Sequence, residues 1–215
     1  MNKDSVATKR DVDVVKSSAE LIDSALGGYV SRVKNALAEI NQGFFEAKFD
    51  NLILDVISGD VSQEELNDFI KSASGEKREF ISNLILKNIQ SDNRLSTFLL
   101  AKLWIQKIKN EKLNYYEQSL FSNINYFSKY DYEIFYEILQ KAKMNSENEY
   151  YISEEELEED YCETAIAKFK NIGLMKEINI QMVFGGASTA RYFLKSSYTD
   201  TFSDYLKEYF ENNQS

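Results

Sequence analysis

Proline and histidine are absent from the 215 residues, and glycine (eight residues) and cysteine (one residue) are scarce. All-β folds spend proline and glycine on their many turns, so this shortage favours a mainly helical chain. Without histidine, the chain lacks the commonest metal ligand and cannot build Ser-His-Asp or Cys-His nucleophilic machinery by itself. A lone cysteine, Cys162, also excludes an intrachain disulfide and a zinc site made of thiolates.

The composition is that of a folded chain, with 43% hydrophobic and 13% aromatic residues. Its polar N-terminus has no apolar stretch of the signal-peptide type. The longest uncharged run, residues 178–190, has thirteen residues and is too short to span a bilayer as a helix. We therefore expect a cytoplasmic protein without a membrane span.

The net charge of −10 is unevenly spread along the chain. Residues 76–112 carry eight basic and four acidic side chains, whereas residues 150–215 carry six basic and twelve acidic ones. An acidic molecule repels phosphate overall, so binding to nucleic acid is disfavoured and only a local contact is compatible with the charge.

Residues 1–128 are predicted to form a helical domain. Apolar residues three and four apart indicate a helix over Ser17–Ile40. We interpret Gly27 and Gly28 as a tolerated weak point in it, in preference to a kink, a close helix crossing or a break. Ser62 and Glu65 match a capping box, and residues 91–93 supply turn and cap chemistry. The further helices are expected over 44–57, 63–72, 76–90, 95–109 (apolar nearly all round, hence central) and 113–127.

Residues 129–215 are predicted to form a winged-helix-like α+β domain. The expected order is helix, short helix, helix and then a β-hairpin with a glycine turn, followed by a terminal helix. The predicted elements are helices Tyr130–Lys143, Ser153–Glu158 and Tyr161–Asn171, strands Leu174–Phe184 and Ala190–Ser196, and helix Thr199–Phe210, with a linker over Met144–Tyr150. The fold class is thus mainly α, with a C-terminal winged-helix-like end.

Two stretches carry a resemblance to a known group. The first comprises Lys77–Ile81, Leu99–Leu103 and Lys112–Glu117, and the second comprises Ala167–Leu174, Tyr192–Leu194 and Phe202. Together they resemble uncharacterised helical proteins of bacteria and prophages with a winged-helix end, among which the abortive-infection alpha-type proteins are named relatives. The resemblance covers roughly residues 60–210 and implies a protein of mobile elements that takes part in phage defence or its evasion. It transfers no active-site residue.

The basic segment offers a candidate protein interface. Its lysines form either a solvated outer face or a docking surface for an acidic partner, which includes another copy of the chain. The tyrosine-rich run that follows either belongs to the core or adds amphipathic rings that suit an interface. The candidate interface residues are Lys102, Lys107, Lys109, Tyr115 and Tyr116.

The winged-helix-like end offers an alternative, in which the third helix and the wing read DNA as a dimer. The donors for such contacts are Thr164, Lys168, Lys170, Arg191 and Lys195. The acidic run Glu154–Asp160 opposes this reading because carboxylates repel phosphate. We therefore predict a non-enzymatic protein-interaction module that binds another protein or itself, with no catalytic residue, metal or cofactor, and keep the dimeric DNA regulator as the alternative.

Overall fold

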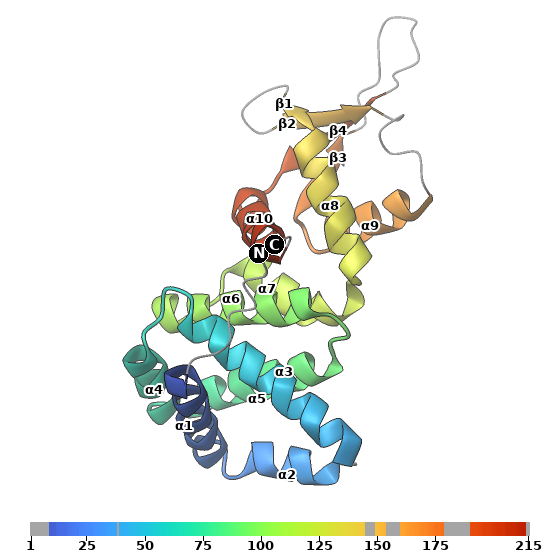
Figure 1. Cartoon of the computed structure of the whole chain (residues 1–215). Helices are drawn as coiled ribbons and strands as arrows, with labels where there is room; N and C mark the ends of the chain where they lie inside the picture. The colour runs from blue at the N-terminus through green and yellow to red at the C-terminus, as the bar shows by residue number, and fades with distance from the viewer. Residues whose placement is uncertain (1–8, 38, 145–148, 154–159, 179–189, 214–215) are drawn as a thin grey trace, which may run out of the picture. The chain divides into compact units, whose positions relative to one another are not determined.

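The computed structural model describes residues 9–37, 39–144, 149–153, 160–178 and 190–213. The chain divides into two compact units, an N-terminal unit over residues 1–113 and a C-terminal unit over residues 114–214. The protein is mainly helical with a small antiparallel sheet of four strands in the described residues (Figure 1). No helix in these described ranges combines the length and the apolar character that crossing a bilayer requires.

The N-terminal unit consists of helices whose ends are fixed by local polar contacts. As predicted, Ser62 forms a capping box: its hydroxyl accepts from the Glu65 amide at 3.2 Å, and its own amide donates to the Glu65 carboxylate at 2.7 Å. The Asn93 side chain likewise accepts from the Ser96 amide at 2.8 Å. The elements are α1 (Lys9–Ala25), α2 (Tyr29–Ala36), α3 (Glu39–Ile57), α4 (Gln63–Lys71), α5 (Glu76–Gln90) and α6 (Arg94–Asn110).

Gly27 and Gly28 break the helix that the sequence predicted to run from Ser17 to Ile40. Both glycines adopt positive φ angles, +64° and +77°. Residues with a Cβ rarely adopt this left-handed backbone, and no helix continues through two such residues in succession. The interpretation of the pair as a weak point inside one helix was therefore wrong, because α1 ends at Ala25 and α2 begins at Tyr29.

The core of the N-terminal unit forms where α6 packs on α3. Leu100, Leu103 and Trp104 of α6 are fully buried, as are Leu52 and Ile53 of α3. The nearly continuous apolar surface of α6 predicted this central place, and the prediction is confirmed.

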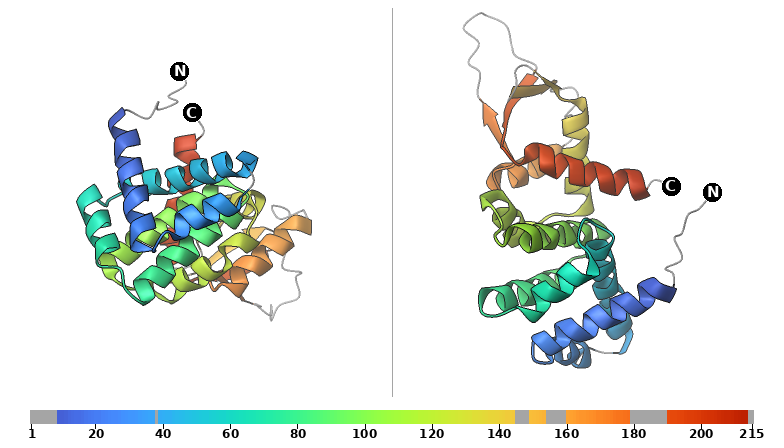
Figure 2. Two further views of the ribbon diagram at one scale, coloured as in Figure 1. Left: turned by 90° about the horizontal axis from the view of Figure 1, so that it is seen from below. Right: turned by 90° about the vertical axis from the view of Figure 1, so that its left-hand side faces the viewer.

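The C-terminal unit places helices beside the sheet, whose strand order is β1-β2-β4-β3 with every neighbouring pair antiparallel. Helices α9 and α10 both pack against α8 (Figures 1 and 2). The elements are α7 (Tyr115–Asn123), a 3-10 turn (Ile124–Tyr126), α8 (Lys129–Lys141), β1 (Lys143–Met144), β2 (Glu149–Ser153), α9 (Asp160–Asn171), β3 (Met175–Ile178), β4 (Ala190–Lys195) and α10 (Thr199–Asn213).

An aromatic cluster forms the core of the C-terminal unit. The ring of Phe169 in α9 lies 4.1 Å from that of Phe135 and 4.8 Å from that of Phe127, measured between centroids. Phe202 of α10 and Tyr132 of α8 complete the cluster at 6.1 and 6.2 Å from the Phe169 ring. All five rings are buried, so this cluster ties three helices together.

Three sequence predictions differ from the structure in this unit. The domain boundary was predicted after residue 128, whereas the chain divides into its two compact units after residue 113, and Phe127 packs on Phe169 inside the C-terminal unit. The predicted linker Met144–Tyr150 contains the end of β1 and the start of β2. Ser153 ends β2 instead of starting a helix, and residues 154–158 of that predicted helix lie outside the described residues.

The predicted hairpin is seen in part. Strands β3 and β4 form an antiparallel pair in which Met175 lies opposite Lys195 and Ile178 lies opposite Tyr192. The predicted strand end over 179–184 and the turn at Gly185 and Gly186 lie outside the described residues. The terminal helix is confirmed as α10.

We predict that Phe169→Ala lowers the free energy of unfolding by about 3–5 kcal/mol, because it opens a cavity among buried rings. Urea unfolding followed by circular dichroism measures this change. The matched control is Tyr130→Ala in α8, whose side chain is 75% exposed and should change stability by less than about 0.5 kcal/mol. Equal effects of the two substitutions would contradict the central place of Phe169.

Candidate functional site: a groove between three helices

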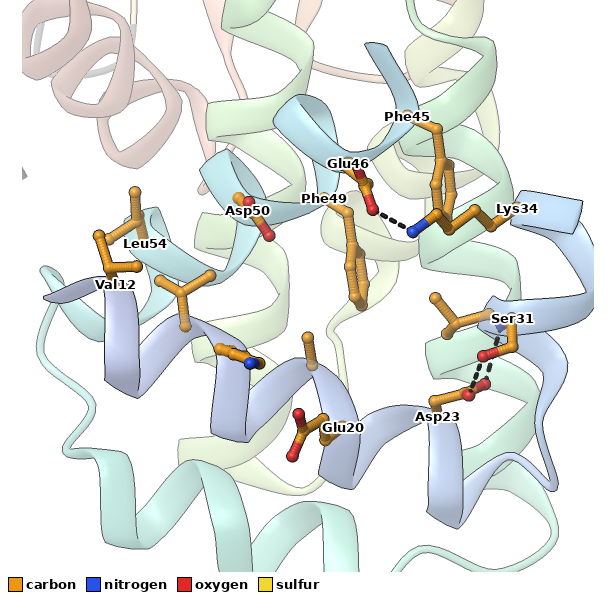
Figure 3. A pocket seen from close by; sticks show the side chains of 14 residues that line it. Val12, Glu20, Asp23, Ser31, Lys34, Phe45, Glu46, Phe49, Asp50 and Leu54 are labelled. Atoms are coloured by element: carbon orange, nitrogen blue, oxygen red, sulfur yellow. Dashed lines mark hydrogen bonds and ion pairs between the residues drawn. The ribbon is translucent and has the colours of Figure 1, made fainter. Parts of the chain in front are cut away.

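A groove of about 650 Å³ lies between α1, α2 and α3 in the N-terminal unit (Figure 3). Its α1 wall consists of residues three and four apart: Val12, Val15, Lys16, Ala19, Glu20 and Asp23. At a rise of 1.5 Å per residue, the stretch from Val12 to Asp23 runs for about 16 Å along the helix axis. The hollow is therefore elongated and follows about three turns of α1.

The glycine break gives the groove its end. After Gly28 the chain reverses, and the Asp23 carboxylate on α1 accepts a hydrogen bond from the Ser31 amide on α2 at 3.0 Å. Arg32 supports the turn by donating to the Gly27 carbonyl at 2.6 Å. Figure 3 shows Asp23 and Ser31 at one end of the groove and Val12 at the other. The turn thus holds α2 against the groove.

Apolar side chains supply most of the exposed lining of the groove. Phe45 and Phe49 of α3 stack with parallel rings 5.9 Å apart, and both are buried. Val12 at the open end is 55% exposed, which leaves an aliphatic side chain in water beside an apolar surface. A partner that covered these groups would gain hydrophobic free energy.

Carboxylates dominate the charged part of the lining. Glu20, Asp23, Glu46 and Asp50 face only two ammonium groups, those of Lys16 and Lys34. Lys34 is paired with Glu46, and Asp23 is hydrogen-bonded to Ser31. Within the described residues, Asp50 and Glu20 have neither a hydrogen bond nor an ion pair through their carboxylates. With four carboxylates and two ammonium groups, the lining carries a net charge of −2.

The two aspartates of the rim differ in their electrostatics. Burial raises the pKa of Asp50, and the nearby charge of Glu46 raises it further, while Lys34 opposes both. Burial also acts on Asp23, but there the hydrogen bonds from Ser31 outweigh it, so the pKa of Asp23 is lowered. Asp50 is exposed, so water screens much of this unfavourable charge, and its cost to the folded protein is small.

The predicted interface lysines do not form one exposed face. Lys107 is buried, with 6% of its side chain exposed, and its ammonium donates to Glu76 at 2.7 Å. Lys109 is paired with Asp60 at 3.3 Å, and the Lys102 ammonium lies 5.1 Å from the centroid of the Phe98 ring. Lys107 is therefore a structural residue of the N-terminal unit and cannot present its charge to a partner.

The other predicted interface residues belong to the C-terminal unit. Tyr115 is 75% exposed and meets the half-buried Tyr116 edge to face, with centroids 5.4 Å apart. A second hollow, of about 490 Å³, brings both tyrosines together with Lys170 and Lys195, which the sequence proposed as DNA contacts. The structure thus joins residues from the two predicted sets in one place.

Most of the predicted DNA contacts are engaged within the chain. Lys168 is paired with the buried Asp131 at 2.6 Å, Lys170 with Glu177 at 2.6 Å, and Lys195 with Asp200 at 2.7 Å. Thr164 is exposed on α9. Arg191 lies in β4, but its side chain is outside the described part of the structure.

Sequence reasoning missed the groove because it started the first helix too late. The predicted start at Ser17 left out Val12 and Val15, which line the hollow. The signal was present, since Val12, Val15, Ala19 and Ile22 recur at spacings of three and four. In the described ranges, no group of three or more acidic or thiol side chains is placed to hold a metal ion.

We predict that Asp50→Asn stabilises the protein at neutral pH. Because the pKa of Asp50 is raised in the folded state, the native protein binds more protons than the unfolded chain, so the carboxylate's stability cost appears as pH rises above its ordinary value of 3.8. The urea midpoint of the variant should exceed that of the original protein near pH 7, and the gap should close as pH approaches 3.8. Glu20, which lines the groove from α1 and is exposed as Asp50 is, provides the control Glu20→Gln, and an equal gain there would contradict the special environment of Asp50.

No protein-family model, no curated protein and no solved structure matches this chain. What the protein does must therefore be argued from the chemistry of the groove and of the second hollow.

Proposed function

We propose that this protein is a non-enzymatic protein-interaction module whose groove between α1, α2 and α3 binds an amphipathic helix of a partner protein. The observation that supports this proposal is the combination of an elongated apolar floor with unpaired carboxylates at its rim. An amphipathic helix laid into an apolar groove is a recurring mode of peptide recognition.

The dimensions of the groove favour a helix over a small ligand. A run of about 16 Å matches about three turns of a helix, or eleven residues. Sites for small molecules usually bury most of the ligand in a concave pocket. This hollow instead follows the α1 wall from Val12 to Asp23, so a helix would gain contact along that wall.

The charges favour a basic partner helix. Asp50 on α3 and Glu20 on α1 come from opposite walls, and among the described residues neither carboxylate forms a hydrogen bond or an ion pair. A lysine or arginine beside the apolar stripe of the incoming helix would relieve the unfavourable charge of Asp50, and charge complementarity would speed the encounter. An acidic helix would meet like charge on both walls.

We predict that a basic amphipathic peptide of about 15 residues, with a leucine stripe and flanking lysines, binds the full chain saturably. Ala19→Trp should weaken this binding on the order of tenfold or more, because Ala19 lines the groove and a large ring would fill it. Asp50→Lys should weaken it as well and should reduce its dependence on salt. Fluorescence anisotropy of the labelled peptide measures each affinity.

Two controls make this experiment decisive. Ala47→Trp introduces the same side chain at an exposed position of α3 outside the groove and should leave the affinity unchanged. A peptide with glutamate in place of lysine should bind at least tenfold more weakly. Equal binding of both peptides, or equal effects of the two tryptophans, would refute the groove as the binding site.

The winged-helix DNA regulator remains the second candidate because of the strand order in the C-terminal unit. Strand β2, which precedes α9 in the chain, pairs with β4. Strand β4 in turn pairs with β3, which follows α9. This order is compatible with a recognition helix followed by a wing. The three ion-paired lysines weigh against it, because each would have to leave a carboxylate to reach a phosphate.

A duplex-binding experiment separates the two functions. On the DNA hypothesis, labelled genomic fragments bind at about 50 mM salt, and Thr164→Glu, an exposed change on α9, weakens binding on the order of tenfold. On the protein-interaction hypothesis, which we favour, no fragment binds at this salt concentration. Thr164→Glu is a cleaner test than Lys168→Glu, because the latter would place a carboxylate beside the buried Asp131.

We further propose, from the family resemblance alone, that this module acts in the cytoplasm and is encoded in a prophage or a defence region. Its gene neighbourhood tests the setting. A neighbourhood without mobile-element or defence genes would speak against it, whereas the groove experiment stands independently of the outcome.

A further inference from the structure

Among the residues that the structure describes, the sheet of the C-terminal unit ends at β3. In the described residues, β3 pairs with β4 on one side only, so its other side offers backbone amides and carbonyls to a new neighbour. Natural sheets usually protect such an edge, since it is a ready template for another strand. Lys176 lies within the four-residue strand, and a charged lysine on an edge strand opposes uncontrolled pairing with other strands.

A hollow lies at one end of the β3–β4 pair. It has a volume of about 490 Å³ and lies where α9 ends, β3 begins and β4 ends. Tyr115 and Tyr116 of α7 form one wall, and the Tyr116 ring fits closely over Gly173, at 3.3 Å from the position that a Cβ there would take. Tyr115 is held edge-on to Tyr116 and still leaves 75% of its side chain in water. A ring that is so exposed and yet ordered by a neighbour is available for contact with a partner.

Lysines surround the same hollow inside an otherwise acidic unit. Residues 114–214 carry nine basic and eighteen acidic side chains, yet Lys170, Lys176 and Lys195 all line this one place. Among its described lining residues, Glu177 alone is acidic. Lys170 and Lys195 are each paired with one carboxylate. Lys176 is exposed and has no ion pair within the described residues. The local charge is therefore positive where the unit as a whole is negative.

We infer that the β3 edge binds an extended acidic segment of another protein as an additional strand, with an apolar side chain of that segment seated against Tyr115 and Tyr116. Main-chain hydrogen bonds to β3 supply affinity, and side chains that alternate along the added strand supply specificity. Glutamate or aspartate in the segment pairs with Lys176 and competes for Lys170 and Lys195. This second surface is independent of the helix groove and goes beyond the function proposed above.

If a peptide adds to β3 as a strand, its binding must depend on hydrogen bonds from the peptide main chain. Synthetic peptides can test this dependence on the full chain. The probe is a labelled peptide of about seven residues in which glutamates alternate with valines around one central leucine. Its two matched variants carry lysines in place of the glutamates, or N-methyl groups on alternate amides that prevent strand addition. We expect the acidic peptide to bind, and both variants to bind at least about tenfold more weakly.

Matched substitutions in the protein locate the site. Lys176→Glu on β3 should weaken binding on the order of tenfold, whereas Lys143→Glu on β1, at the opposite edge of the sheet, should not. Tyr115→Ser should also weaken binding, whereas Tyr130→Ser, an equally exposed tyrosine, should not. Hydrogen exchange should show new protection of the amides of β3 when the acidic peptide is bound.

Several outcomes would overturn the inference. Equal binding of the N-methylated peptide would mean that charge attraction alone holds it, and equal effects of Lys176→Glu and Lys143→Glu would remove β3 as the site. Absence of binding by the acidic peptide, or self-association of the chain through β3 in light scattering, would also refute it. Ala19→Trp should leave this interaction unchanged, so failure here and failure of the groove are distinguishable.

Discussion

Two successive residues with positive φ determine the form of the N-terminal unit. Because Gly27 and Gly28 adopt a backbone that side chains with a Cβ resist, α1 stops at Ala25 and the chain turns back into α2. The turn is then fixed by polar contacts, with Asp23 accepting from Ser31 and Arg32 donating to Gly27. If the helix continued straight, α2 would not lie against α1 and α3, and the groove would lose the end that Asp23 and Ser31 form. The glycine backbone conformation thus positions α2, and the side chains of the three helices then line the groove.

Asp50 illustrates how a charge in the lining of the groove can oppose stability. Partial desolvation and the neighbouring charge of Glu46 raise the pKa of Asp50, so its carboxylate weakens the folded state, although water screens much of this effect because the residue is exposed. Groups that cost stability without compensation inside a fold are often retained for binding or catalysis. Lys107 is the opposite case, since its buried ammonium is satisfied by Glu76 and lies 5.8 Å from the Phe80 ring centroid, so it needs no partner.

The sequence was most informative where a local signal determines local structure. The capping box at Ser62 and the all-round apolar character of α6 led to correct elements because each depends on contacts within a few residues. The sequence was least informative for β2. This strand pairs with residues of β4 that are about forty positions away, and no pattern within β2 itself indicates that pairing. The groove was missed for another reason. The apolar stripe of α1 begins at Val12, inside a charged N-terminal stretch whose composition does not indicate a helix. The burial of Lys107 could not be read from sequence, because a basic residue in a helix is usually solvated.

Net charge is a poor guide to recognition in this protein, because the two candidate surfaces have opposite signs. The groove of the N-terminal unit carries four carboxylates and two ammonium groups, whereas the hollow at β3 carries three ammonium groups and one carboxylate. At physiological ionic strength the Debye length is about 8 Å, so a docking segment responds to the charges within a few side chains of it, while the total of −10 acts mainly on approach. A basic helix and an acidic strand can therefore each find a matching surface on one acidic chain. The same argument makes duplex DNA the least suitable partner, because it spans many side chains and would meet the acidic majority of the surface.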